Sequence, residues 1–225
     1  MVVLLSINNL QNSEIKFYND AYIDNSSRIA RGYGWDYLPS KVVIELVKRN
    51  KLDKSIIGKS FLDVGCGDGR HLNYFSNLGY SCTGVDFSSE AIKYCRKRFK
   101  SNISLSKLDA TKDVLLNKIG KFDLILDWSV LDHIRSKHVS RYIKNLYDAV
   151  NNNGKIIFVE FAPTSNFLNT GKRKYTLTSG HYSRVYSFEE LSKVVYPFKV
   201  IDYCIDICED KANDIKMNAI ICIKT

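Results

Sequence analysis

The segment Leu62-Asp-Val-Gly-Cys-Gly-Asp-Gly-Arg70 constrains the fold of this chain more than any other. Residues 60–64 predict a short strand, and residues 68–78 predict a helix that follows the glycines directly. Glycine permits positive φ and leaves room for a ligand to approach the backbone, and the helix start behind it is polarised. The segment therefore predicts a strand, a tight turn and a helix arranged around a ligand.

The glycine spacing disfavours a dinucleotide as that ligand. Dinucleotide-binding turns read G-x-G-x-x-G, whereas here the third glycine comes one residue earlier. Asp63 and Asp68 bracket the loop, and two carboxylates so close would repel a pyrophosphate. They would tolerate a cationic amino acid. The alternative for Asp63 is a cap or turn carboxylate.

Strands and helices are predicted to alternate from residue 60 onward, which favours right-handed crossovers and a parallel sheet. Two helices, 14–25 and 40–50, precede the sheet, and the polar loop 209–214 joins the last two strands into a hairpin that adds an antiparallel edge. The predicted strands are 60–64, 81–86, 102–108, 122–126, 155–161, 198–207 and 216–223.

Acidic residues stand at the ends of three further predicted strands. Asp86 ends the second strand, where a carboxylate can accept both hydroxyls of a ribose. Asp109 and Asp127 follow the third and fourth strands. Ligands of open α/β sheets bind at the carboxyl ends of the strands, so these carboxylates and Asp63 are expected to meet in one crevice.

These motifs together resemble the class I methyltransferases that depend on S-adenosylmethionine (SAM). The resemblance covers about residues 55–160 and implies an α/β fold: a doubly wound, seven-stranded, mostly parallel sheet with an antiparallel terminal strand and helices on both faces. The motifs are Leu62–Arg70, Gly84-Val-Asp-Phe-Ser88, Asp109-Ala110, Phe122-Asp-Leu-Ile-Leu-Asp127 and Asn153-Gly-Lys-Ile-Ile157.

The resemblance also implies roles for individual residues. Asp63 would lie near the amino group of the methionyl part, Asp86 would bind the ribose, and Phe87 would flank the adenine. The whole set expected to bind SAM, and its product S-adenosylhomocysteine, is Asp63, Gly65, Cys66, Gly67, Gly69, Asp86, Phe87, Asp109, Ala110, Asp127 and Trp128.

One methyltransferase domain, residues 1–225, is expected to contain four parts. They are an N-terminal helical cap (1–55), the SAM-binding core (56–160), an acceptor-side lid (161–190), and a closing helix with a strand pair (191–225).

His133 is the predicted catalytic residue. Methyl transfer is an in-line displacement, and a base is needed only when the acceptor must lose a proton. His133 follows the fourth strand and would serve as that base or orient the acceptor; polar packing beside the cofactor is the alternative.

The acceptor side is predicted from two basic and aromatic segments. The lid carries no acid between 161 and 188, and its basic residues would bind a carboxylate or phosphate unless they form a solvated loop. Aromatic residues of the cap would close over the sulfonium unless they pack in its core. The acceptor-side residues predicted in these segments are Tyr22, Arg31, Trp35, Arg173, His181 and Arg184.

Three functions remain open at this point. A small molecule, neutral or anionic, is the first acceptor class, and the formal net charge of +9 also fits a tRNA. A subunit that binds SAM and activates a partner is the third. No RNA-binding motif is visible.

Six cysteines without a CxxC pair indicate reduced thiols in a cytoplasmic protein, and no metal site is expected. The apolar start, Met1–Leu5, is too short for a signal peptide or a membrane span.

Overall fold

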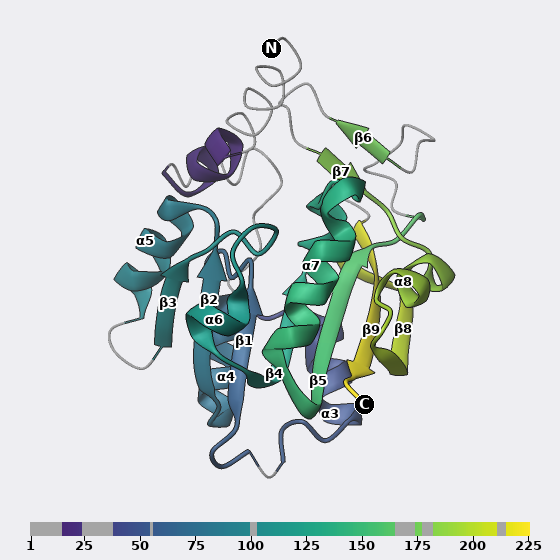
Figure 1. Ribbon diagram of the computed structural model, residues 1–225, viewed down its shortest axis with the longest axis horizontal. Helices are drawn as coiled ribbons and strands as arrows, with labels where there is room; N and C mark the ends of the chain where they lie inside the picture. The colour runs from purple at the N-terminus through teal and green to yellow at the C-terminus, as the bar shows by residue number, and fades with distance from the viewer. Residues whose placement is uncertain are drawn as a thin grey trace.

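Seven strands form one sheet in the order β3-β2-β1-β4-β5-β9-β8 (Figure 1). This computed structural model describes residues 15–23, 38–54, 56–99, 103–164, 174–176, 182–210 and 215–225. The strands of the sheet are β1 (Ser60–Val64), β2 (Ser81–Asp86), β3 (Ile103–Lys107), β4 (Phe122–Trp128), β5 (Val150–Phe161), β8 (Lys199–Asp210) and β9 (Ile215–Ile223).

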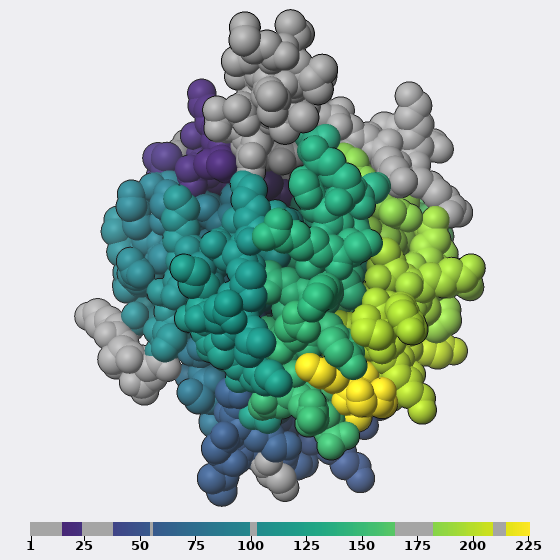
Figure 2. Space-filling model, in the orientation of Figure 1, coloured from purple at the N-terminus to yellow at the C-terminus, as the bar shows by residue number. Residues whose placement is uncertain are grey.

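The first five strands of the chain pair in parallel, and β9 pairs antiparallel with both β5 and β8. Helices cover both faces: α3, α4 and α5 pack into one apolar cluster, and α6, α7 and α8 into the other. In the space-filling view α6 and α7 cover the near face (Figure 2). The helices are α3 (Lys41–Arg49), α4 (Arg70–Leu78), α5 (Ser89–Arg98), α6 (Leu115–Ile119), α7 (Ser136–Ala149) and α8 (Phe188–Val194).

The predicted fold class is confirmed, with one refinement at the edge of the sheet. The last two strands do form an antiparallel pair, but β9 lies inside and β8 forms the edge. Most of β9 is buried, whereas β8 exposes Ile201, Tyr203 and Ile205. Asp202 ties β8 to α3, because its carboxylate accepts two hydrogen bonds from Arg49, at 2.6 and 2.8 Å.

Side-chain hydrogen bonds fix the starts of two helices. Ser88 caps α5 by accepting a hydrogen bond from the Ala91 N–H at 3.1 Å. Ser187 and Glu190 form a capping box at the start of α8. The Ser88 hydroxyl also donates to the Asn19 side chain at 2.7 Å, which fixes the helix 15–23 against the start of α5.

The parallel strands end at one side of the molecule, and two further pieces lie over that side (Figure 1). One is the helix 15–23, and the other is a ribbon of β6 (Lys174–Thr176) and β7 (Tyr182–Arg184), which the sequence did not predict. Within the described residues, no helix has the length and apolar character needed to cross a membrane. The fold thus encloses the carboxyl ends of the strands.

Candidate active site

The glycine turn connects β1 to α4 and forms the floor of the site. Gly65 and Gly67 have φ of +66° and +52°, a region that side chains disfavour. A Cβ on Gly67 would lie 2.7 Å from the Tyr22 hydroxyl, and one on Gly65 would overlap the Val130 side chain. The turn therefore needs glycine at both positions, because backbone strain and close neighbours coincide there.

Asp86 joins this turn to the next one. Its Oδ2 accepts a hydrogen bond from the Gly67 N–H at 3.1 Å, and its Oδ1 accepts one from the Ser88 N–H at 2.8 Å. Burial raises the pKa of Asp86 to about 6, although these backbone N–H groups act in the opposite direction. Asp86 is therefore mainly ionised at neutral pH, with its carboxylate bordering the pocket.

Asp63 lies beneath the turn and is almost completely buried. Its Oδ2 has no hydrogen-bond partner in the structure. Burial raises its pKa well above the usual range; Arg70 opposes this rise, and Asp68, Asp86 and Asp127 add to it. A buried carboxyl oxygen without a donor is costly, so this position is suited to an incoming N–H group.

A pocket of about 620 Å³ opens over the turn. Gly65, Cys66, Gly67 and Asp68 contribute its floor. The predicted cofactor residues that also line it are Asp86, Phe87, Asp109, Ala110 and Trp128; Asp63, Gly69 and Asp127 lie outside the lining.

Asp109 borders the pocket, but its carboxylate is hydrogen-bonded within the turn to which it belongs. Its Oδ1 accepts hydrogen bonds from the Thr111 hydroxyl at 2.6 Å and the Thr111 N–H at 3.0 Å, and its Oδ2 lies 3.0 Å from Lys112 Nζ. Burial raises its pKa, but the hydrogen bonds from Thr111 and Lys112 outweigh burial, so the net shift is downward. Asp109 therefore stays ionised at the pocket wall.

Asp127, near the end of β4, stabilises the loop that follows this strand. Its Oδ1 accepts hydrogen bonds from the Val130 and Leu131 N–H groups, at 3.0 and 3.2 Å, and its Oδ2 accepts one from the Tyr142 hydroxyl at 2.8 Å. Ser129, within this loop, has a φ of +54°. The carboxylate of Asp127 thus holds the strained turn that carries the next pocket residues.

Two more carboxyl groups are fully buried near Asp127. Asp132 belongs to the 3-10 turn Leu131–His133, and its N–H donates to Glu160 Oε2 at 2.9 Å. Burial raises the pKa of Asp127 to about 7 and that of Glu160 well above its usual range, with Asp132 adding to both shifts. We call Asp127, Asp132 and Glu160 the buried acid cluster. Burial first, and then repulsion between the carboxylates, favours protonated forms of these three groups.

This cluster predicts that the protein becomes more stable as the pH falls from about 8 to about 6. The folded pKa of Asp127 is raised, so its stabilising contribution is complete below the unfolded pKa and is lost as the pH rises through about 7. Asp127 alone should raise the melting temperature by about 3–5 °C across that interval. Thermal unfolding of wild type and Asp127→Asn tests this, because the variant should lack that part of the slope. Equal slopes in both proteins would contradict it.

His133 lies in the pocket wall, within 6.0 Å of the ring of Tyr18 and 5.9 Å of the ring of Phe161, measured between ring centroids. Its Nδ1 is 3.0 Å from the Tyr182 carbonyl oxygen, which can only accept, so Nδ1 carries a proton. Its Nε2 is 3.3 Å from Asp132 Oδ1. This contact joins His133 to the buried acid cluster.

The predicted acceptor-side residues divide into three groups. Tyr22 lines the pocket. Arg184 does not; its guanidinium lies 4.3 Å from the ring centroid of Tyr186 and 3.8 Å from Glu190 Oε1. Arg31, Trp35, Arg173 and His181 lie outside the described residues.

Sequence reasoning missed the basic residues at the start of α7. Arg135, Lys137 and His138 all line the pocket. The signal was present, because this basic run directly follows the loop after a strand of the parallel sheet. Among the described residues, no group of three or more His, Cys, Asp or Glu residues is placed to hold a metal ion.

Residues 61–154 match the protein family described as a methyltransferase domain. Ubiquinone biosynthesis O-methyltransferases from Glaesserella parasuis and Actinobacillus pleuropneumoniae are similar to this chain, with 29% and 30% identity over 110 and 112 residues. These matches cover 46% and 44% of this chain and 47% and 48% of the relatives. The chain thus spans about half the length of the curated relatives it matches.

Solved structures extend the similarity of fold to nearly the whole chain. Magnesium protoporphyrin IX methyltransferase from Synechocystis PCC 6803, with bound S-adenosylhomocysteine, superposes with a TM-score of 0.69 at 16% identity, covering 94% of this chain and 100% of that one. A SAM-dependent methyltransferase from Anabaena variabilis gives 0.67 at 16% identity, covering 94% and 93%. The fold that the resemblance to the class I methyltransferases implied is confirmed.

Proposed function

We propose that this chain, which has the class I methyltransferase fold and a methyltransferase domain over residues 61–154, transfers a methyl group from SAM to a small-molecule acceptor. S-adenosylhomocysteine is the second product. The O-methyltransferases among the relatives support a small acceptor.

The unpartnered carboxyl oxygen of Asp63 carries this proposal. It lies under the glycine turn, which Asp86 joins to the turn after β2, and the pocket above is bordered by further carboxylates. SAM supplies an ammonium group as the donor that Asp63 lacks, and two ribose hydroxyls as additional donors to Asp86. Its positive sulfonium also suits the acidic side of the pocket.

The side chains around the pocket support the roles that the sequence predicted. Phe87, whose ring centroid is 5.1 Å from that of Tyr18, would flank the adenine. SAM supplies an electrophilic methyl group, and the protein's part is to orient the acceptor in line with it and exclude water. Phe161 and Tyr182 line the pocket, which supports the lid role of residues 161–190.

His133 remains our proposed base for an acceptor that must lose a proton. Nε2 is the nitrogen for that step, because the Tyr182 carbonyl engages Nδ1. Asp132 Oδ1 lies 3.3 Å from Nε2 and helps to position the ring.

The two alternative functions, methylation of tRNA and activation of a partner protein, receive less support. The relatives named above give no support to tRNA, for which the formal charge of +9 remains the main observation. A non-catalytic activator would bind SAM without turning over any acceptor. We place the protein in the cytoplasm, because all six cysteines are free thiols.

Calorimetric titration with SAM and S-adenosylhomocysteine tests the proposed function. We expect affinities of roughly micromolar order and release of a proton, because an ammonium group beside Asp63 lowers a pKa that burial has raised. Proton release appears as a dependence of the measured heat on the ionisation enthalpy of the buffer. Adenosine is the matched control, since it lacks the amino group and should release no proton from Asp63. Absence of binding to both SAM and S-adenosylhomocysteine would refute the proposal.

A further inference from the structure

The acidic residues of the described pocket lining, Asp68, Asp86 and Asp109, all come from the part of the chain between β1 and α6. This part also contributes Arg70 and Lys112, and Lys112 pairs with Asp109 at 3.0 Å. From β4 onward, the described lining residues include Arg135, Lys137 and His138 but no acid. A ligand with one positive and one negative end would therefore be oriented by this pocket.

The basic side coincides with the start of α7, a 14-residue helix. Arg135 occupies its N-cap without a side-chain cap hydrogen bond, and the first turn holds no acidic residue. Helix starts attract anions, because their N–H groups point outward and their dipoles are positive there. The pKa of His138 is lowered by burial and then by Lys137; Asp109 opposes this shift, and Lys112 and Arg141 add to it, so the cations outnumber the acid around this helix start.

Tyr182 gives a second, independent indication of a ligand at this side. It lines the pocket, is only 8% exposed, and has a hydroxyl without a hydrogen-bond partner. The Arg135 guanidinium lies 5.3 Å from the centroid of its ring. A buried hydroxyl of this kind is suited to donate to an anionic oxygen.

Building on the proposed function, we infer that the methyl acceptor carries an anionic group, a carboxylate or a phosphate, bound by Arg135, Lys137 and Tyr182. The cationic methyl donor then occupies the side with Asp68, Asp86 and Asp109, and the acidic acceptor occupies the other. His133 borders the acceptor's part of the pocket. The pocket selects its acceptor by charge as well as by size.

Binding of three small probes to protein saturated with S-adenosylhomocysteine tests this inference. Benzoate carries a carboxylate, phenyl phosphate carries a phosphate, and benzamide is a neutral control of similar shape. We expect at least one anion to bind about tenfold more tightly than benzamide. The tighter anion identifies the acidic group. Equal affinities, or no binding of either anion at millimolar concentration, would overturn the inference.

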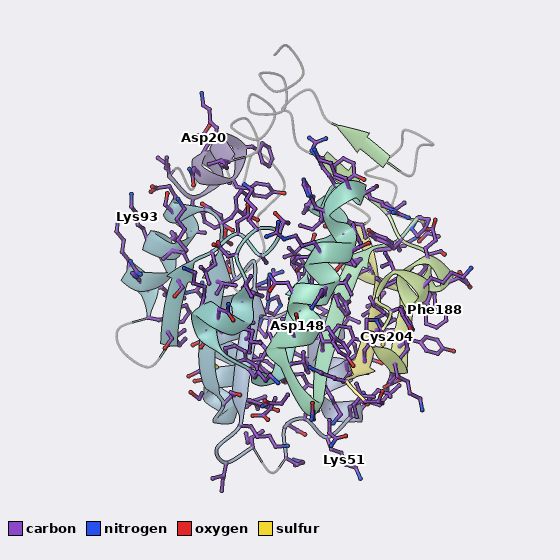
Figure 3. All side chains as sticks on the ribbon, in the orientation of Figure 1. Asp20, Lys51, Lys93, Asp148, Phe188 and Cys204 are labelled. Atoms are coloured by element: carbon purple, nitrogen blue, oxygen red, sulfur yellow. The ribbon has the colours of Figure 1, made fainter. Side chains whose placement is uncertain are left out.

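Variants locate the anionic group. Arg135→Gln and Lys137→Gln should each reduce the preference for the anion about fivefold or more while leaving S-adenosylhomocysteine affinity and melting temperature unchanged. Lys144→Gln is the matched control, because Lys144 is on the same helix but pairs with Asp148 at 2.6 Å, and Asp148 lies away from the strand ends (Figure 3). A preference that survives both pocket substitutions would overturn the assignment.

Two further outcomes separate the inference from the proposed function. Methylation of neutral acceptors as efficiently as acidic ones would refute the inference and leave the methyltransferase intact. Failure to bind S-adenosylhomocysteine would refute both. Displacement of benzoate by unfractionated tRNA, with a steep dependence on salt, would overturn the small-molecule class in favour of RNA.

Discussion

Replacing Asp86 with alanine is expected to weaken SAM binding at least about 100-fold, because each hydrogen bond to an ionised group contributes about 1.5–3 kcal/mol. The carboxylate would accept both ribose hydroxyls, and it also accepts the hydrogen bond that holds Gly67. Calorimetry on wild type and variant measures the loss. Asp86→Asn should retain more affinity than Asp86→Ala, since an amide keeps one acceptor oxygen.

The pH dependence of binding gives an independent readout of Asp86. Its pKa is raised to about 6, so the carboxylate is present above that pH and is protonated below it. SAM affinity should therefore fall as the pH is lowered through about 6, and Asp86→Asn should lose the part of this fall that protonation of Asp86 causes.

Glu90→Gln is the control for the loss of an acidic side chain close to Asp86 in the sequence. Glu90 is on α5 and pairs with Lys93, which points outward from the molecule (Figure 3). Its replacement should leave binding unchanged. Wild-type affinity in Asp86→Ala would contradict the assigned role of Asp86 in the ribose site.

Replacing Gly65 with alanine is expected to cost about 2–4 kcal/mol of unfolding free energy. Positive φ costs an alanine roughly 1 kcal/mol, and overpacking against Val130 adds about 1–3 kcal/mol. The melting temperature should fall by about 5–15 °C. SAM affinity should fall as well, because relief of the overlap moves the turn that forms the pocket floor.

Gly58→Ala separates the two causes. Gly58 also has a positive φ, +76°, but a Cβ there would meet no atom within 4 Å. This control should lose only about 1 kcal/mol and should bind SAM normally. Thermal unfolding and calorimetry of both variants provide the comparison. Equal losses of unfolding free energy in the two variants would show that the overlap with Val130 does not contribute to the loss in Gly65→Ala.

The sequence by itself determined the parallel part of the sheet. Buried strands such as β4, with Leu124, Ile125 and Leu126 in succession, are rich in apolar residues, and the helices between them have apolar residues at helical spacing, so both can be predicted locally. The carboxylates of Asp86 and Asp109 were placed correctly at the pocket, because parallel strands bring their carboxyl ends together. Asp63 also lies near the carboxyl end of a parallel strand, β1, beneath the glycine turn.

Only the tertiary structure decided which neighbours those residues have. Asp132 and Glu160 meet because β4 and β5 lie side by side, and nothing local marks either residue as buried. The position of Tyr182 was likewise decided by the tertiary structure, because its strand β7 has only three residues and is too short to predict. The inner position of β9 in the sheet is a further case. The periodicity of apolar residues indicates which face of a strand or helix is buried. Which residues pack against that face depends on strand order and long-range packing.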